Sequence, residues 1–134
     1  MRISETLVSE VEDAGVRVSE FQLDFDCAES KLDGYRIWVQ TIHEAINPVP
    51  LVITALPSWL DRRSFRHLAA VSDGYVLQVH SLRRPKTPGD HGALCDPVAA
   101  RSAIRKAGRI GIDFRVALPT YGYKIGRASC RERV

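Results

Sequence analysis

The chain has 134 residues, of which 45% are hydrophobic and 26% charged, a composition that suits one soluble α/β-type domain and excludes a disordered or collagen-like polymer. No apolar run approaches the roughly 18 residues that a membrane span needs. Residues 1–5 do not show the charged-then-apolar pattern of a signal peptide, so they indicate no compartment. The formal net charge of +3 would favour an anionic partner.

The last ten residues, 125–134, carry much of that positive charge. Their sequence, IGRASCRERV, resembles one reading frame of a common sequencing adapter, so we expect a non-native tail and exclude it from the fold. Without its three arginines and one glutamate the net charge is +1, and no basic stripe is interleaved with aromatic residues, which gives nucleic-acid binding little support. We therefore expect residues 1–124 to be a fragment of a longer protein.

Helices and strands are predicted to alternate along the chain. Helices are expected where apolar residues recur at helical spacing after a capping residue, at 4–15, 30–46, 61–70 and 96–108. The last of these has the strongest start, because an N-cap residue, Asp96, is followed by Pro97. Strands are expected at 21–26, 51–56, 75–80 and 114–118, and a loop of some fifteen residues at 81–95.

This alternation predicts parallel strands joined by helical crossovers, in either an open doubly wound sheet or a piece of a (β/α)₈ barrel. Strands of an open parallel sheet are apolar on both faces. Here strand 21–26 has Gln22, Asp24 and Asp26 on one face, and strand 75–80 has Gln78 and His80. The inner face of a barrel opens into an active-site mouth and accommodates such residues. We predict a partial TIM barrel of about four βα units.

Cysteine and histidine usage points to no metal or disulfide framework. Outside the tail, Cys27 and Cys95 are too few for a disulfide scaffold and lack CxxC spacing, which leaves their redox state open. His80 with Asp24 and Asp26 would form a carboxylate and imidazole metal site. No HxH or HExxH spacing supports that alternative, and no Gly-rich phosphate loop follows any strand, so we predict no metal and no cofactor.

Six runs of the sequence resemble, in this order, the bacterial domain of unknown function family 3142: FQLDFDC, SKLDGYRIWV, ITALPSWL, DGYVLQVHSL, LCDP and FRVALPTYGY. The resemblance covers about residues 20–123. That family in turn resembles the glycoside-hydrolase group of TIM barrels, which implies a carbohydrate-related role.

Two carboxylates are the candidate catalytic residues. Asp24 and Asp26 stand at the carboxyl end of their strand, where barrel enzymes keep their chemistry, and their i, i+2 spacing aims both side chains into the mouth. Such a pair suits glycosidic-bond cleavage, because neighbouring carboxylates separate into an acid and a base. The run is similar to the DxxDxDxE motif of chitinase-type barrels, but Phe21 replaces the first Asp and Ala28 the Glu, and Glu29 is one position out of register. The structural alternative is that the two aspartates bind loop amides.

The candidate substrate-binding residues also lie at strand ends. Gln78 and His80 would position a sugar, and three aromatic residues would stack on it, unless they only pack the barrel rim: Trp59, Tyr121 and Tyr123. Arg115 shares a strand face with Ala117 and could face Asp24 or Asp26. The loop with Arg83, Arg84, Lys86 and His91 is either a lid or a solvated connection, and His43 and His67 are expected to be surface or interfacial.

Two hypotheses follow for function. The first is a carbohydrate-active hydrolase that uses the acidic pair, with further partners from strands outside this chain, so that the fragment alone is inactive. The second is a non-catalytic carbohydrate-binding or envelope-associated protein on the same scaffold. In both, the expected ligand is a carbohydrate. Because half a barrel leaves two unpaired strand edges, we also expect the isolated chain to self-associate.

Overall fold

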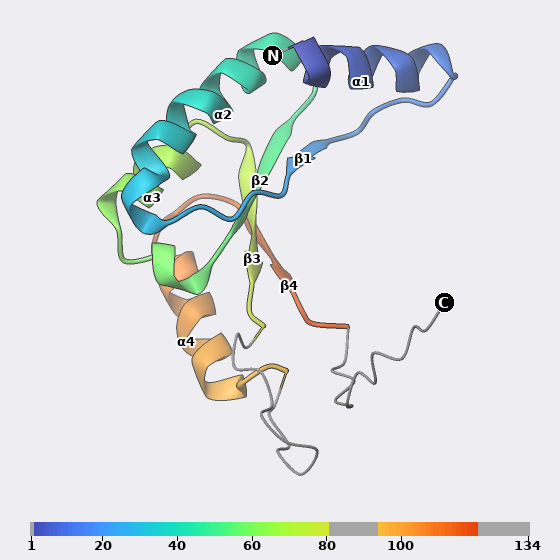
Figure 1. Ribbon diagram of the computed structural model, residues 1–134. Helices are drawn as coiled ribbons and strands as arrows, with labels where there is room; N and C mark the ends of the chain where they lie inside the picture. The colour runs from blue at the N-terminus through green and yellow to red at the C-terminus, as the bar shows by residue number, and fades with distance from the viewer. Residues whose placement is uncertain (1, 81–93, 121–134) are drawn as a thin grey trace, which may run out of the picture.

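The computed structural model describes residues 2–80 and 94–120 (Figure 1). Helices and strands alternate in the order α1 (Arg2–Asp13), β1 (Phe21–Leu23), α2 (Leu32–Ile46), β2 (Leu51–Ala55), α3 (Arg63–Ala69), β3 (Gly74–Gln78), α4 (Pro97–Gly108) and β4 (Phe114–Ala117). Two short 3₁₀ turns, η1 (Glu29–Lys31) and η2 (Pro57–Trp59), follow β1 and β2.

The four strands form one sheet in the order β1-β2-β3-β4, and every neighbouring pair is parallel. This confirms the predicted α/β class with parallel strands. Consecutive strands can pair in parallel only because a helix lies between them and returns the chain to the same end of the sheet. All four carboxyl ends therefore lie at one edge of the sheet.

The core lies between the sheet and three helices. Figure 1 shows α2, α3 and α4 on the same side of the sheet. The strand residues that belong to this core alternate, as in Leu51, Ile53 and Ala55 of β2, and join apolar residues of α2 and α3. The intervening residues of β2, Val52 and Thr54, are buried but lie on the opposite face. This second face carries polar side chains as well, among them Thr54, Gln78 and Arg115.

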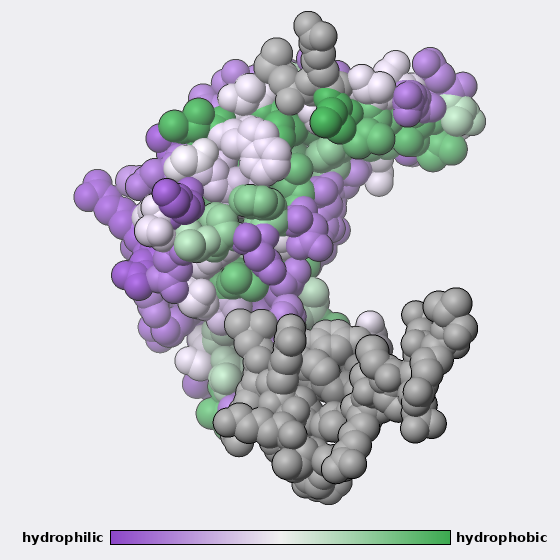
Figure 2. All heavy atoms as spheres, in the orientation of Figure 1, coloured by the Kyte–Doolittle hydropathy of each residue, from purple (hydrophilic) through white to green (hydrophobic). Residues whose placement is uncertain are grey.

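The helix α1 lies apart from this layer, beside the end of α2 and the amino ends of the strands (Figure 1). Apolar residues gather along it in Figure 2. A pocket of about 370 Å³ opens between α1 and the start of β1, lined by Leu7, Val11, Val18 and Phe21 among others. The described residues contain no helix long and apolar enough to cross a membrane.

Three of the four predicted helix starts are wrong, and one is confirmed. Asp96 caps α4 as predicted, accepting hydrogen bonds from the amides of Val98 and Ala99 at 2.8 and 3.3 Å. By contrast α1 begins at Arg2 and contains the buried Ser4. The N-cap positions of α2 and α3 are Lys31 and Arg62, which make no side-chain cap bond. The predicted caps there are used elsewhere, because Ser30 lies within η1 and Asp61 pairs with Lys106.

Candidate functional site

Three polar side chains meet at the carboxyl ends of β1, β2 and β3. The hydroxyl of Thr54 donates to Oδ1 of Asp24 at 2.9 Å. The side-chain amide of Gln78 donates to the same oxygen at 3.4 Å. Asp24 and Gln78 are 54 positions apart, so the parallel sheet alone brings them together.

The register of the sheet explains this meeting. Leu23 pairs with Ile53 and Thr54 with Val76, so one further step along β1 sets Asp24 beside Thr54 on the face away from the helices. Thr54 is only 2% exposed, whereas Asp24 is exposed. A buried hydroxyl thus fixes one oxygen of an exposed carboxylate. Within residues 2–80 and 94–120, no donor reaches the second oxygen, Oδ2.

Asp26 lies outside this hydrogen-bonded group. β1 ends at Leu23, three residues earlier than the predicted strand, because its pairing with β2 stops there. Phe25 packs its ring against Tyr35 and Trp38, with centroid distances of 5.4 Å in both cases. Asp26 follows as an exposed side chain. The pKa of the neighbouring Cys27 thiol is raised mainly by burial, and the charge of the Asp26 carboxylate raises it further. Cys27 is therefore less reactive at neutral pH than a free thiol.

Tyr35 of α2 carries a buried hydroxyl beside the candidate site. The residue is 4% exposed, and its hydroxyl is the buried side-chain polar atom without a hydrogen-bond partner in the described part of the chain. Burial raises the pKa of Tyr35, and the charges of Cys27, Asp24 and Asp26 raise it further. The hydroxyl therefore keeps its proton at all physiological pH values.

Trp59 is not available for stacking on a sugar, which corrects the expectation for this residue. It lies in η2 with 1% of its surface exposed, and its indole packs between Tyr35 and Phe65. The strand-end position is as predicted, but η2 folds the ring back into the core. Tyr121 and Tyr123, the other predicted stacking residues, lie outside the described residues, as does the loop with Arg83, Arg84, Lys86 and His91.

His80 follows β3 at the same edge of the sheet. It lines a pocket of about 200 Å³ together with Pro57 after β2 and Asp96 before α4. The structure therefore places His80 at the rim formed by the segments that follow β2 and precede α4.

Arg115 of β4 pairs with Glu20, just before β1, and not with Asp24 or Asp26. Its register partner is Val76, which places it on the face away from the helices. The ion pair joins β4 to the start of β1, the two edge strands of the sheet. The expectation that Arg115 faces Asp24 or Asp26 is therefore wrong, because its guanidinium forms an ion pair with Glu20 instead.

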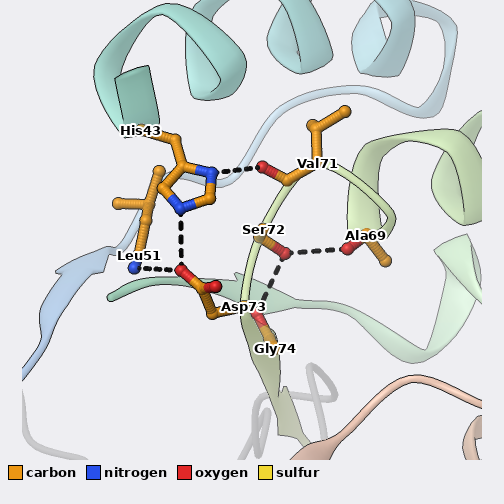
Figure 3. A network of polar contacts seen from close by, with 7 residues as sticks. All are labelled: His43, Leu51, Ala69, Val71, Ser72, Asp73 and Gly74. Carbon is orange, nitrogen blue, oxygen red and sulfur yellow. Dashed lines mark hydrogen bonds and ion pairs between the residues drawn. The ribbon is translucent and has the colours of Figure 1, made fainter. Parts of the chain in front are cut away.

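A second polar network lies at the opposite end of the sheet and is structural (Figure 3). His43 of α2 contacts the carbonyl of Val71 through Nδ1 at 3.2 Å and a carboxylate oxygen of Asp73 through Nε2 at 2.9 Å. The same oxygen accepts from the amide of Leu51 at 2.8 Å. These contacts tie α2 to the amino ends of β2 and β3, whereas the candidate site lies at the carboxyl ends of the same strands.

The described side chains of the candidate site do not form a metal centre. No group of three or more His, Cys, Asp or Glu side chains that could hold a metal ion occurs among the described residues. The donor set around Asp24 is one carboxylate, one hydroxyl and one amide, which suits hydrogen bonding to a polar organic ligand.

Comparisons with known proteins identify a family. No curated protein and no solved structure matches this chain. One family model matches residues 1–134, a range that includes the ten residues expected from the sequence to be non-native, so the foreign origin of that tail stays a prediction. On this match the chain belongs to the family described as Domain of unknown function (DUF3142).

Proposed function

We propose that this chain is part of a carbohydrate-active hydrolase in which Asp24 is a carboxylate of the active site. The observation that carries the proposal is the fixing of Asp24 Oδ1 by Thr54 and Gln78, from two other strands, at the carboxyl edge of the sheet. Active sites of parallel βα folds lie at that edge. An exposed carboxylate that is held by its neighbours on one oxygen keeps the other for a ligand.

The scaffold we propose for this site is a (β/α)₈ barrel. Four parallel strands in sequential order, with α2, α3 and α4 on one side only, are the arrangement that half of such a barrel would have. In that barrel the face that carries Asp24, Thr54 and Gln78 is the inner one. The ion pair between Arg115 and Glu20 would then lie in its interior.

The chemistry proposed is glycosidic-bond hydrolysis by two carboxylates. Such enzymes use one group as an acid and a second as a nucleophile or base. Asp24 has two donors directed at one oxygen, so we assign to it the role of the nucleophile or base. Asp26 is the second carboxylate of the proposal, and Gln78 and His80 position the sugar.

A non-catalytic carbohydrate-binding protein is the second candidate. One observation favours it: the hydrogen-bonded group contains a single carboxylate, and Asp26 is not joined to it in the described residues. A carboxylate with a fixed amide and hydroxyl beside it is sufficient to recognise sugar hydroxyl groups without cleaving a bond.

The test uses the longer protein of which this chain is proposed to be part, and measures turnover and affinity separately for a panel of glycan oligosaccharides. The variants are Asp24→Asn and Asp26→Asn, with Asp33→Asn in the first turn of α2 as the charge-matched control. For a hydrolase, Asp24→Asn lowers turnover by about 100-fold or more while affinity changes little. For a binding protein, the longer wild-type protein binds without turnover and Asp24→Asn weakens the affinity. If Asp24→Asn behaves as Asp33→Asn does in both measurements, the proposal is wrong.

A further inference from the structure

The outer face of α4 carries three arginines in one row. Arg101, Arg105 and Arg109 follow one another at four-residue intervals, so their Cα atoms are spaced by about 6 Å along the helix axis and lie on one side of it. All three are exposed. Like charges at this spacing repel one another and destabilise an isolated helix. The row therefore opposes helix formation unless an anion neutralises it.

Among residues 2–80 and 94–120, no carboxylate neutralises this row. Other cations nearby do have partners: Lys106 pairs with Asp61 and Arg62 with Glu29. In the described part of the chain, no ion pair reaches Arg101, Arg105 or Arg109. Two of the row's charges, at 105 and 109, lie near the carboxyl end of α4, where the helix dipole favours cations, but Arg101 lies in the first half.

The row lines a groove along α4. The groove has a volume of about 530 Å³ and is lined by the three arginines together with Pro97, Val98, Ser102 and Lys106. The pocket that contains His80 is lined by Asp96 and Ala99, which flank Pro97 and Val98 in the first turn of α4. Each of the two hollows is thus lined by residues at the amino end of α4.

We propose that this groove binds an acidic polysaccharide, a glycan chain that carries carboxylates, and guides it to the candidate site. This inference rests on the proposed function and adds the substrate class to it. Guanidinium groups bind carboxylates in bidentate fashion, which suits uronate sugars. Val98, which is 79% exposed, and Pro97 offer an apolar surface for the face of a sugar ring.

The lining of the groove favours a glycan over the other polyanions. Single-stranded nucleic acid is bound by aromatic side chains that stack on bases, and none of the described residues that line this groove is aromatic. A membrane surface would require a broad apolar face beside the basic one. Here the apolar residues of the lining are confined to the first turn of α4.

The experiment titrates the 134-residue chain with oligomers of polygalacturonate and with the same oligomers after reduction of their carboxyl groups. A single-stranded DNA oligomer and vesicles containing phosphatidylglycerol are the further probes. The test variant is Arg101→Gln/Arg105→Gln, and the matched control is Arg63→Gln/Arg66→Gln on α3, which removes the same charge from exposed positions. Circular dichroism of each variant verifies that it is folded.

The expected result is that the uronate oligomer binds at least about 10-fold more tightly than its reduced form, and that the test variant loses most of this preference while the control keeps it. Equal affinity for the two forms, or an equal loss in both double variants, overturns the inference. So does tighter binding of the DNA or the vesicles through the same arginines. If the reduced oligomer binds and Asp24→Asn abolishes this binding, the proposed function stands without the acidic substrate. If neither oligomer binds, the acidic substrate is wrong, whereas the proposed function is judged by the glycan panel described above.

Discussion

The hydroxyl of Thr54 reaches from β2 to the carboxylate of Asp24, 2.9 Å away, at a point where β1 has already ended. The same hydroxyl lies 3.4 Å from the carbonyl of Leu23, the last residue of β1. A hydroxyl has one proton to donate, and the shorter distance indicates that Asp24 receives it. Thr54 thus orients the carboxylate that the proposed function requires.

Replacing Thr54 tests this orientation. Thr54→Val keeps the shape and removes the donor, so we expect glycan affinity or turnover to fall by about 10-fold. The free energy of unfolding should change by no more than about 1 kcal/mol, since Asp24 is exposed and retains Gln78. Thr54→Ser keeps the donor and should retain most of the function. Titration and chemical denaturation of both variants provide the measurements, and equal function in the two would refute the orienting role.

Replacing each of two buried tyrosines with phenylalanine should change the free energy of unfolding in opposite directions. The hydroxyl of Tyr75 donates to the carbonyl of Ala107 at 3.3 Å, whereas that of Tyr35 has no partner in the described residues. Tyr35→Phe should raise the free energy of unfolding by about 1 kcal/mol, because it removes an unsatisfied buried donor. Tyr75→Phe should lower it by about 1 kcal/mol. Urea denaturation of both variants at neutral pH measures the difference. Stabilisation by Tyr75→Phe or destabilisation by Tyr35→Phe would contradict the assignment.

Alkaline pH should destabilise the protein partly through Tyr35. Burial raises the pKa of its hydroxyl above the ordinary value of about 10, so above that pH the unfolded chain loses a proton that the folded chain retains. The contribution of Tyr35 to the free energy of unfolding is therefore complete below about pH 10 and decreases as the pH rises further. The free energy of unfolding should fall less steeply above pH 10 in Tyr35→Phe than in the wild type. Some slope should remain, because burial also raises the pKa of Tyr75. Parallel curves for the two proteins would refute this origin.

The order of elements could be predicted from the sequence because it depends on local patterns. The start of α4 at Asp96 and Pro97 was correct, since a cap needs only the next three amides. Ser30 and Asp61 have the same local signal, but a 3₁₀ turn and a distant lysine use them instead. Such competition depends on residues far along the chain, so no local pattern reveals it.

The candidate site could be predicted only in part for the same reason. Alternation along the strands placed Asp24 and Gln78 on one face, and the parallel sheet then brought them together. The direction of a ring after a strand end depends on packing, so the sequence left open whether Trp59 stacks on a sugar or packs, and in the structure it packs in the core. Tyr35 was missed as a polar group, because in a helical stripe its ring is indistinguishable from any other core residue.

The contacts of Asp73 predict a loss of stability on its removal. One carboxylate oxygen of Asp73 accepts from the amide of Leu51 and contacts the ring of His43 (Figure 3). Asp73→Ala should lower the free energy of unfolding by about 1–2 kcal/mol, because the amide at the start of β2 loses its acceptor. Asp73→Asn retains one oxygen and should cost less. Asp13→Ala, at the end of α1, is the control for loss of an exposed carboxylate. Equal effects of Asp73→Ala and Asp13→Ala in chemical denaturation would rule out a role for the network.

Gly74 has a backbone that only glycine adopts readily, with φ at +155°. A Cβ atom there would lie 3.0 Å from the carbonyl oxygen of Asp113. That oxygen accepts a hydrogen bond from the backbone amide of Tyr75 at 3.2 Å. If this oxygen moved away from the new Cβ atom, the hydrogen bond between β3 and the segment before β4 would lengthen. Gly74→Ala should therefore lower the free energy of unfolding by about 1–3 kcal/mol.

Gly34 in α2 provides the matched control for this substitution. No atom lies within 4 Å of a Cβ built there, so Gly34→Ala should raise the free energy of unfolding by about 0.5–1 kcal/mol through helix propensity. Urea denaturation of the two alanine variants thus gives shifts of opposite sign from one chemical change. A stabilising Gly74→Ala would mean that β3 and β4 do not approach each other at Asp113 as described. In that case the register that sets Arg115 on the same face as Val76 would be wrong as well.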